Sequence, residues 1–403
     1  MKVPYPIILL HGLGQKADVW HGAATKYFLE ELGLRHGGDL RVDASKNVRA
    51  SKAGGGDADL YTVTFSSAFD SVNAWRDEVE AVVTYVRNVT GADRVTLVGY
   101  SMGGLAARAY LVKRLTDHHV KRLITIGTPH LGSPYARIWN WKSRMEECAS
   151  NGNVIAVPPC KAALAAIQGA EGDVPFDAPA VRDLRRPEDG GDYLRRLSKY
   201  SHPLDVEYVS VVGDVNLLDE VTALRQGAIQ ETLRKVLAAA TGTLGELFEP
   251  GDGVVSTKSQ NIMNIEFFNA DKSRQRMART VNVSSAHVDH LARNSDVQRI
   301  LLDEKPEYKG ASICLVGGFP TLVVDVQDHI PMLCSVAATI NSSPIASYSA
   351  ANGSARLVRT QSGIFARFTL PLSNVPLDVP DLYTINITIT NSFGYVVRAT
   401  VEW

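Results

Sequence analysis

A serine flanked by glycines lies at the point where an apolar strand pattern gives way to a helical pattern. Residues 95–98 predict a buried strand, Ser101 follows within Gly99-Tyr100-Ser101-Met102-Gly103, and residues 105–111 predict a helix. Strand, Gly-x-Ser-x-Gly and helix in this order form a tight turn that exposes the serine hydroxyl at the carboxyl end of a parallel sheet. The glycines permit this turn because they carry no Cβ. The spacing therefore predicts that Ser101 is the nucleophile of an acyl-transfer reaction.

A glycine-rich loop near the N-terminus offers a donor for the negative charge that acyl transfer creates. The apolar residues 3–10 predict a first strand, which ends at His11-Gly12-Leu13-Gly14. The carbonyl oxygen of the substrate becomes an oxyanion in the transition state, so two N–H donors must point at it. We predict that the backbone amides of Leu13 and Met102 form this oxyanion hole.

Two later loops supply an acid and a base, in the chain order Ser, Asp, His. Asp252 lies between two glycines, and Asp214, which follows a predicted strand, is the rival acid. His287 directly follows a short predicted strand, and His290 lies three residues further on. A serine needs a base to remove its proton, and the base needs a carboxylate to hold its tautomer. The sequence predicts Asp252 and His287 in these roles and leaves His290 as the alternative base. The histidine that is not the base is expected in a cleft or at the surface.

Four motifs together resemble the α/β-hydrolase superfamily and, within it, bacterial lipases and esterases. These motifs, all within residues 3–304, are His11-Gly12-Leu13-Gly14, Gly99-Tyr100-Ser101-Met102-Gly103, Gly127-Thr128-Pro129-His130-Leu131-Gly132-Ser133 and Asp252-Gly253-Val254-Val255. The resemblance implies a serine hydrolase of carboxylic esters with a Ser–Asp–His triad. His130 is predicted to be structural, because it lies at a strand end and in the wrong chain order for the base.

The resemblance leaves both histidines open as the base. The run that begins at His287 is similar to the base motif of the lecithin-acyltransferase-like branch, whereas Val-Asp-His-Leu around His290 is similar to that of thermophilic bacillus and staphylococcal lipases. Some related lipases hold structural calcium or zinc, but no ligand spacing for either is found here, so no cofactor is predicted. Esterases or depolymerases of short or polymeric esters, phospholipases and acyltransferases use the same residues. A binding protein of the same fold is the alternative that is not an enzyme.

The chain is long enough for two domains, and its composition changes near residue 307. Residues 1–307 predict an α/β-hydrolase domain with a mostly parallel sheet flanked by helices. Residues 134–204 and 215–248 separate predicted strands by far more than a usual connection and are predicted to form a cap or lid over the site. Residues 308–403 predict a β-sandwich of about seven strands, resembling an immunoglobulin domain. Its predicted role is either to bind a polymer or surface, or to shield the hydrolase.

Two local patterns make more specific predictions. Residues 77–88 predict a helix with apolar side chains on one face and Asp77 and Glu78 in its first turn. Residues 385–389 and 397–403 alternate apolar and polar side chains on either side of a turn, which predicts a hairpin with one buried face.

Composition limits the kinds of binding partner that the chain is expected to have. The net charge of −1 gives no field that would attract nucleic acid or an anionic membrane, and no apolar stretch is long enough to span a bilayer. The expected partner is an acyl-ester substrate, with a lipid or polymer interface as one place where it would be met, and the oligomeric state stays open. The chain enters its first predicted strand after Met1-Lys2, so it is expected to be cytoplasmic, or secreted if it is a trimmed mature form.

The local cysteine pairs, Cys148 with Cys160 and Cys314 with Cys334, are candidates for disulfides, with free thiols as the alternative.

Overall fold

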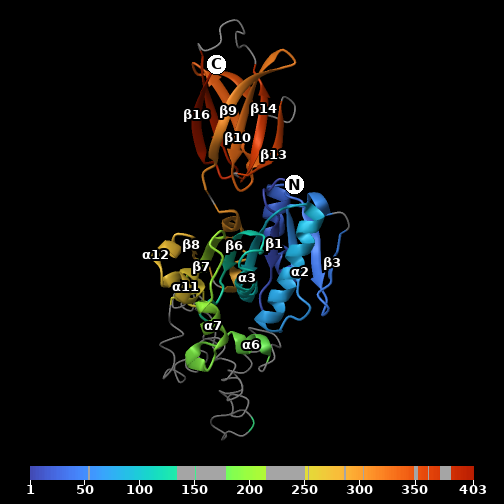
Figure 1. Cartoon of the computed structure of the whole chain (residues 1–403), viewed down its shortest axis with the longest axis vertical. Coiled ribbons are helices and arrows are strands. Elements are labelled where there is room, and N and C mark those ends of the chain that lie inside the picture. Colours follow the sequence, from blue (N-terminus) through green and yellow to red (C-terminus); the bar gives the residue numbers. More distant parts are fainter. Residues whose placement is uncertain are drawn as a thin grey trace, which may run out of the picture.

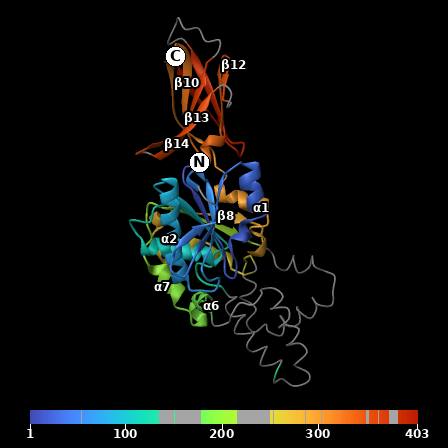
Figure 2. The same ribbon diagram turned by 90° about the vertical axis from the view of Figure 1, so that its right-hand side faces the viewer.

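The computed structural model shows two bodies stacked along the long axis of the molecule, one α/β and one all-β (Figures 1 and 2). The described residues are 1–52, 55–133, 150, 178–214, 250–252, 254–285, 287–302, 304–348, 353–361, 363–372 and 383–403. The predicted insertion 215–248 lies outside them, as do most of 134–204 and both Cys148 and Cys160. Among the described residues, no helix is both long and apolar enough to cross a bilayer.

An eight-stranded sheet forms the centre of the α/β body, in the order β3-β2-β4-β1-β5-β6-β7-β8. Its strands are β1 (Ile7–Leu10), β2 (His36–Val42), β3 (Val48–Ala50), β4 (Leu60–Thr64), β5 (Val95–Tyr100), β6 (Val120–Ile126), β7 (Glu207–Gly213) and β8 (Ala278–Val283). All neighbouring strands are parallel except β2 and β3. The predicted α/β-hydrolase-type sheet is therefore confirmed.

Both faces of the sheet are covered, because successive side chains of a strand point to opposite sides. On β1, Ile8 and Leu10 pack into one apolar core with α2 (Val72–Thr90) and α3 (Met102–Lys113). Ile7 and Leu9 pack into a second core on the other face. The further helices are α1 (Ala23–Thr25), α6 (Pro179–Asp183), α7 (Tyr193–Lys199), α10 (Thr257–Gln260), α11 (Glu266–Asn269), α12 (Lys272–Gln275) and α13 (Asn294–Gln298).

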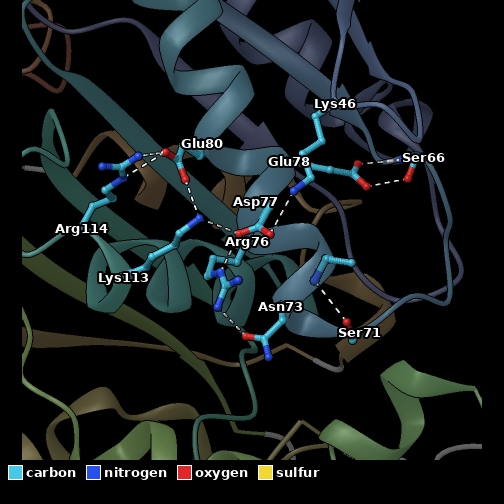
Figure 3. Close-up of polar contacts among 11 residues, drawn as sticks. Lys46, Ser66, Ser71, Asn73, Arg76, Asp77, Glu78, Glu80, Lys113 and Arg114 are labelled. Atoms are coloured by element: carbon cyan, nitrogen blue, oxygen red, sulfur yellow. Dashed lines mark hydrogen bonds and ion pairs between the residues drawn. The ribbon is translucent and has the colours of Figure 1, made fainter.

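Helix α2 begins earlier than its apolar pattern predicts. Its N-cap is Ser71, whose hydroxyl oxygen accepts a hydrogen bond from the Ala74 amide at 3.1 Å (Figure 3). The prediction that Asp77 and Glu78 occupy the first turn is therefore wrong, because the cap lies outside the apolar repeat that was used to place the helix. Glu78 is buried instead, and its carboxylate accepts hydrogen bonds from the Ser66 amide at 2.8 Å and the Ser66 hydroxyl at 2.5 Å.

Ion pairs join α2 to the C-terminal end of α3 (Figure 3). Lys113 contacts Asp77 and Glu80, each at 2.9 Å, and Arg114 also pairs with Glu80. These side chains are partly exposed, so their direct contribution to stability is small. Most of the contact between the two helices is apolar, and it holds the helix that begins next to Ser101 against the sheet.

The all-β body consists of two antiparallel four-stranded sheets, in the orders β13-β14-β10-β9 and β12-β11-β15-β16. The strands are β9 (Glu307–Val316), β10 (Phe319–Gln327), β11 (Ser335–Ile340), β12 (Ser343–Ser347), β13 (Ser354–Thr360), β14 (Gly363–Pro371), β15 (Thr384–Thr390) and β16 (Val396–Glu402). Side chains from both sheets share one apolar core, as expected for a β-sandwich. The immunoglobulin-like strand order stays a prediction.

Two predictions within this body can be compared with the structure. The hairpin is confirmed, since β15 and β16 pair with Ile387 opposite Ala399 and with Ile385 and Ile389 also buried. Cys314 and Cys334 do not form the candidate disulfide. Both are free thiols, Cys314 exposed on β9 and Cys334 buried.

The all-β body lies against the edge of the large sheet where the strands begin. Arg122, near the start of β6, donates from Nη1 to His329 Nδ1 at 2.7 Å, and His329 Nε2 lies 3.1 Å from Glu304 Oε2. Ile330, in the loop after β10, is fully buried in the same core as Ile7 of β1. The opposite edge, where the strands end, faces away from the all-β body (Figure 1).

Candidate active site

Ser101 occupies the turn between β5 and α3, with a backbone conformation of φ 50° and ψ −124°. A positive φ is costly for a residue with a side chain, so the surrounding structure must hold it. The Ser101 amide donates to the Ile126 carbonyl at 2.8 Å, and the Ser101 carbonyl accepts from the Thr128 hydroxyl at 3.0 Å. The next strand, β6, and the loop after it therefore hold the turn on both sides of the serine.

This turn requires glycines, because other backbone atoms pass very close to their Cα atoms. A Cβ on Gly99 would lie 2.3 Å from the Cα of Gly104, and a Cβ on Gly103 would lie 2.4 Å from the carbonyl oxygen of His11. Real Cβ atoms do not approach other atoms so closely, so any side chain here would displace backbone. The Gly-x-Ser-x-Gly pattern is thus explained by packing as well as by turn geometry.

His287 and Asp252 complete a hydrogen-bonded chain with Ser101. His287 Nε2 lies 3.0 Å from Ser101 Oγ, and His287 Nδ1 lies 2.7 Å from Asp252 Oδ2. A carboxylate only accepts hydrogen bonds, so Nδ1 carries a proton and Nε2 is left to accept the proton of the serine hydroxyl. This is the arrangement that a general base for serine requires.

The Asp252 carboxylate is buried and held by several donors. Its Oδ1 accepts from the amides of Val254 at 3.1 Å and Val255 at 2.8 Å, and its side chain is inaccessible to solvent. Burial alone would raise the pKa of Asp252. The charge of His287, and hydrogen bonds from His287, His290 and the Val255 amide, outweigh burial and lower that pKa to about 2. The Asp252 carboxylate is therefore ionised near pH 7.

Backbone contacts join the acid and base loops to each other and to the sheet. The His287 amide donates to the Asp252 carbonyl at 2.8 Å, and the Tyr100 hydroxyl donates to the His287 carbonyl at 2.7 Å. Gln260, fully buried, donates to the carbonyls of Val255 at 2.8 Å and Gly213 at 3.0 Å. The loop of Asp252 is thereby attached to the end of β7.

The loop after β1 lies directly against Ser101. A Cβ on Gly12 would lie 3.0 Å from Ser101 Cβ. His11 holds this loop, because its Nε2 accepts from the Phe65 amide at 3.3 Å and its Nδ1 can therefore donate to the Gly12 carbonyl at 2.8 Å. Burial lowers the pKa of His11 to about 4, so the ring is neutral near pH 7. In the described part of the chain, the amides of Leu13 and Met102 donate to no other protein group.

Comparison with known proteins agrees with this architecture. Residues 5–142 match the family model described as alpha/beta hydrolase fold, which includes the loop after β1 and the Ser101 turn. The eight-stranded, mostly parallel sheet extends this similarity beyond the matched residues. The fold is that of an α/β-hydrolase.

Relatives of the α/β-hydrolase body are named as lipases. A triacylglycerol lipase of Pseudarthrobacter phenanthrenivorans is 32% identical over 138 residues, which cover 33% of this chain and 35% of the relative. A triacylglycerol lipase of Burkholderia plantarii is also 32% identical over 138 residues, covering 33% and 31%. The chain thus matches about a third of the length of these relatives. Among solved structures, a Bacillus licheniformis lipase in mature form aligns with a TM-score of 0.43 at 15% identity, over 73% of this chain and 88% of that one.

The side-chain hydrogen bonds of Ser101 and His287 involve other residues than the two rivals, Asp214 and His290. Ser101 Oγ contacts His287, and His287 Nδ1 contacts Asp252. Asp214, at the end of β7, is exposed, and its amide donates to the Val283 carbonyl at 3.0 Å. His290 is fully buried, with Nε2 3.5 Å from Asp252 Oδ2, so the expectation of a cleft or surface position for the second histidine is wrong. His290 thus lies next to the same carboxylate oxygen that contacts His287.

His130 belongs to a separate buried cluster. Its Nδ1 and its carbonyl each lie 3.2 Å from Arg108 Nη1, and Arg108 Nε donates to His202 Nε2 at 3.2 Å. Burial, together with the Arg108 charge, lowers the pKa of His130 well below its ordinary value. In this position His130 contacts neither Asp252 nor Ser101, and it lies where a structural residue is expected.

Within the described residues, no three His, Cys, Asp or Glu side chains gather in a way that could hold a metal ion.

Several supporting residues were missed by sequence reasoning. Tyr100 and Thr128 lie inside the recognised motifs, but within those motifs roles are predicted only for the glycines, Ser101, Met102 and His130. Gln260 and Arg108 carry no local signal, because Gly213 and His130, which they contact, lie 47 and 22 residues away in the sequence. Burial of a long polar side chain is visible only once the fold is known.

Proposed function

We propose that the chain is a serine hydrolase of carboxylic esters that works through an acyl-enzyme. The observation that carries this proposal is the hydrogen-bonded chain from Asp252 through His287 to Ser101, with distances of 2.7 and 3.0 Å. Both distances allow proton transfer without rearrangement of the protein.

In the proposed first half-reaction, Ser101 Oγ attacks the ester carbonyl while His287 Nε2 removes the hydroxyl proton. Asp252 stabilises the imidazolium that results and keeps the ring in place. The tetrahedral intermediate collapses when His287 returns its proton to the leaving alcohol, which leaves an acyl group on Ser101. In the second half-reaction, His287 removes a proton from water, and the resulting attack releases the carboxylic acid and restores the serine.

The oxyanion of each tetrahedral intermediate is assigned to the amides of Leu13 and Met102. The Met102 amide is at the N-terminal end of α3, where the helix dipole adds to the stabilisation of negative charge. The close contact between Gly12 and Ser101 supports a position for the Leu13 loop beside the reacting carbonyl. Loss of one such donor costs about 10²–10³-fold in kcat in well-studied serine hydrolases. No step of the proposed reaction requires a metal or organic cofactor.

The proposed substrates are acyl esters, as the names of the relatives suggest. A lipase of longer acyl chains is favoured over an esterase of short or polymeric esters, and phospholipase or acyltransferase activity would use the same residues. Fold alone does not choose among these substrates.

The test is hydrolysis of p-nitrophenyl esters from acetate to palmitate by the wild type and by Ser101→Ala, His287→Ala and His290→Ala. We expect Ser101→Ala and His287→Ala each to lose about 10⁴-fold or more in kcat, and the chain-length optimum to distinguish a lipase from an esterase. Labelling of the wild type but not of Ser101→Ala by a fluorophosphonate would identify the nucleophile independently. Wild-type activity in Ser101→Ala would refute the proposal, and absence of labelling would point to a binding protein.

A further inference from the structure

His290 contacts the acid of the proposed triad at the same carboxylate oxygen as His287. His287 begins a 3-10 turn that ends at Asp289, and His290 follows directly. Residues three apart in such a turn lie on the same side, because the turn has three residues per revolution. Both rings therefore face Asp252, whose Oδ2 lies 2.7 Å from His287 Nδ1 and 3.5 Å from His290 Nε2.

The fold makes specific room for this second ring. His290 is fully buried, and a Cβ on Gly213 would lie 2.7 Å from both Cε1 and Nε2 of His290. The two histidine rings meet edge to face, with centroids 6.2 Å apart and an interplanar angle of 80°. Since His290 Nε2 faces a carboxylate oxygen, a proton on that nitrogen gives attraction, whereas a lone pair there would be repelled.

We infer that His290 is a positioning residue for Asp252, with its Nε2–H as a second donor to the oxygen that binds the base. The two carboxylate oxygens then each face two donors: backbone amides at Oδ1, and His287 and His290 at Oδ2. This arrangement opposes rotation of the carboxylate about its Cβ–Cγ bond. It thereby holds His287 in line with Ser101, where a small misplacement is costly for the rate. The inference rests on the proposed function.

His290 is not a spare base in this arrangement. The nitrogen that it directs toward the site faces Asp252, while His287 Nε2 is the histidine nitrogen within hydrogen-bond reach of Ser101 Oγ. Loss of His287 should therefore leave no activity that depends on His290, so His287→Ala and the double variant His287→Ala/His290→Ala should be equally inactive.

The test compares His290→Gln with His290→Leu. The amide nitrogen of glutamine can occupy the place of Nε2 and donate to Asp252, whereas leucine has a similar volume and no donor. We expect His290→Leu to lower kcat by about 10–100-fold, a cost taken by analogy from the loss of outer-shell partners at metal sites, with little change in KM. We expect His290→Gln to recover most of that loss. The downfield NMR proton of the His287–Asp252 hydrogen bond should weaken in His290→Leu and return in His290→Gln.

Controls separate this role from general stability and from the proposed function. His118 is another buried histidine, near the start of β6 at the opposite edge of the sheet, so His118→Leu should leave kcat unchanged while the protein stays folded. If His290→Leu does not fold, His290→Asn replaces it, since the shorter amide cannot reach Asp252. Equal kcat in the glutamine and the leucine or asparagine variants, with Ser101→Ala inactive, would overturn the inference. Activity in Ser101→Ala would instead refute the proposed function itself.

Discussion

Replacement of Asp252 by asparagine should reverse the tautomer of the base without changing the shape of the site. The Oδ1 position faces the amide hydrogens of Val254 and Val255, so an asparagine must place its carbonyl oxygen there and its NH₂ group at the Oδ2 position. That NH₂ group would donate to His287 Nδ1. The imidazole proton would then reside on Nε2, which faces Ser101 Oγ, and the ring could no longer accept the serine proton.

The expected loss is about 10⁴-fold in kcat, the effect of the same tautomer reversal in a well-studied serine protease, which corresponds to about 5 kcal/mol of transition-state stabilisation. The assay is steady-state hydrolysis of a short p-nitrophenyl ester by Asp252→Asn, together with its rate of fluorophosphonate labelling. Asp214→Asn is the matched control and should keep wild-type kcat, because Asp214 is exposed. A loss below about tenfold in folded Asp252→Asn, or a large loss in Asp214→Asn, would refute the assignment of the acid.

Three further predictions follow from packing and burial. Gly103→Ala should lose activity and about 1–3 kcal/mol of stability, because its Cβ would lie 2.4 Å from the His11 carbonyl oxygen; wild-type kcat and Tm would contradict this. His11 and His202 are buried and neutral, with pKa values lowered by burial to about 4 and about 3. The unfolded chain binds more protons below pH 6.5, so each should cost about 2 kcal/mol of stability between pH 7 and pH 5; urea unfolding with equal midpoints at both pH values would exclude this. Ile330→Ala should lower the free energy of unfolding by about 2–5 kcal/mol and leave kcat/KM unchanged, since Ile330 follows β10 of the all-β body and enters the core shared with Ile7 of β1; a parallel loss of kcat/KM would show that the two edges of the sheet are coupled.

The sequence predicts most accurately where structure is local. The strand before Ser101, the glycines around it and the helix after it are adjacent in the chain, so periodicity and turn chemistry suffice to place them. The hairpin of β15 and β16 is equally local, and its alternating pattern gives the observed register. By contrast, the N-cap of α2 precedes the apolar repeat, and the partner of Glu78 is Ser66, twelve residues earlier. No periodicity reveals such a pair.

The choice between His287 and His290 shows a different limit of prediction from sequence. Both histidines follow β8, both are buried, and both have a ring nitrogen within 3.5 Å of Asp252 Oδ2. Each therefore satisfies the order Ser, Asp, His and the requirement for a nearby carboxylate. What separates them is the direction of the second ring nitrogen, and only the His287 ring bridges Asp252 and Ser101. That direction depends on where the loop leaves β8 and on the space beside Gly213, which are properties of the fold.

The position of the all-β body relative to the Ser101 turn bears on the two roles predicted for it. Ser101 follows the C-terminal end of β5, and in a parallel sheet the loops of Asp252 and His287 meet at that same edge. The all-β body is attached at the other edge, where Arg122 near the start of β6 contacts His329 and where Ile330 enters the core. The full length of the strands therefore separates it from the nucleophile (Figure 1). A body so placed does not lie over the Ser101 turn. Both predicted roles, binding to a polymer or surface and shielding of the hydrolase, stay predictions. Binding to a surface or polymer through its outward end is compatible with an active site that faces away from it.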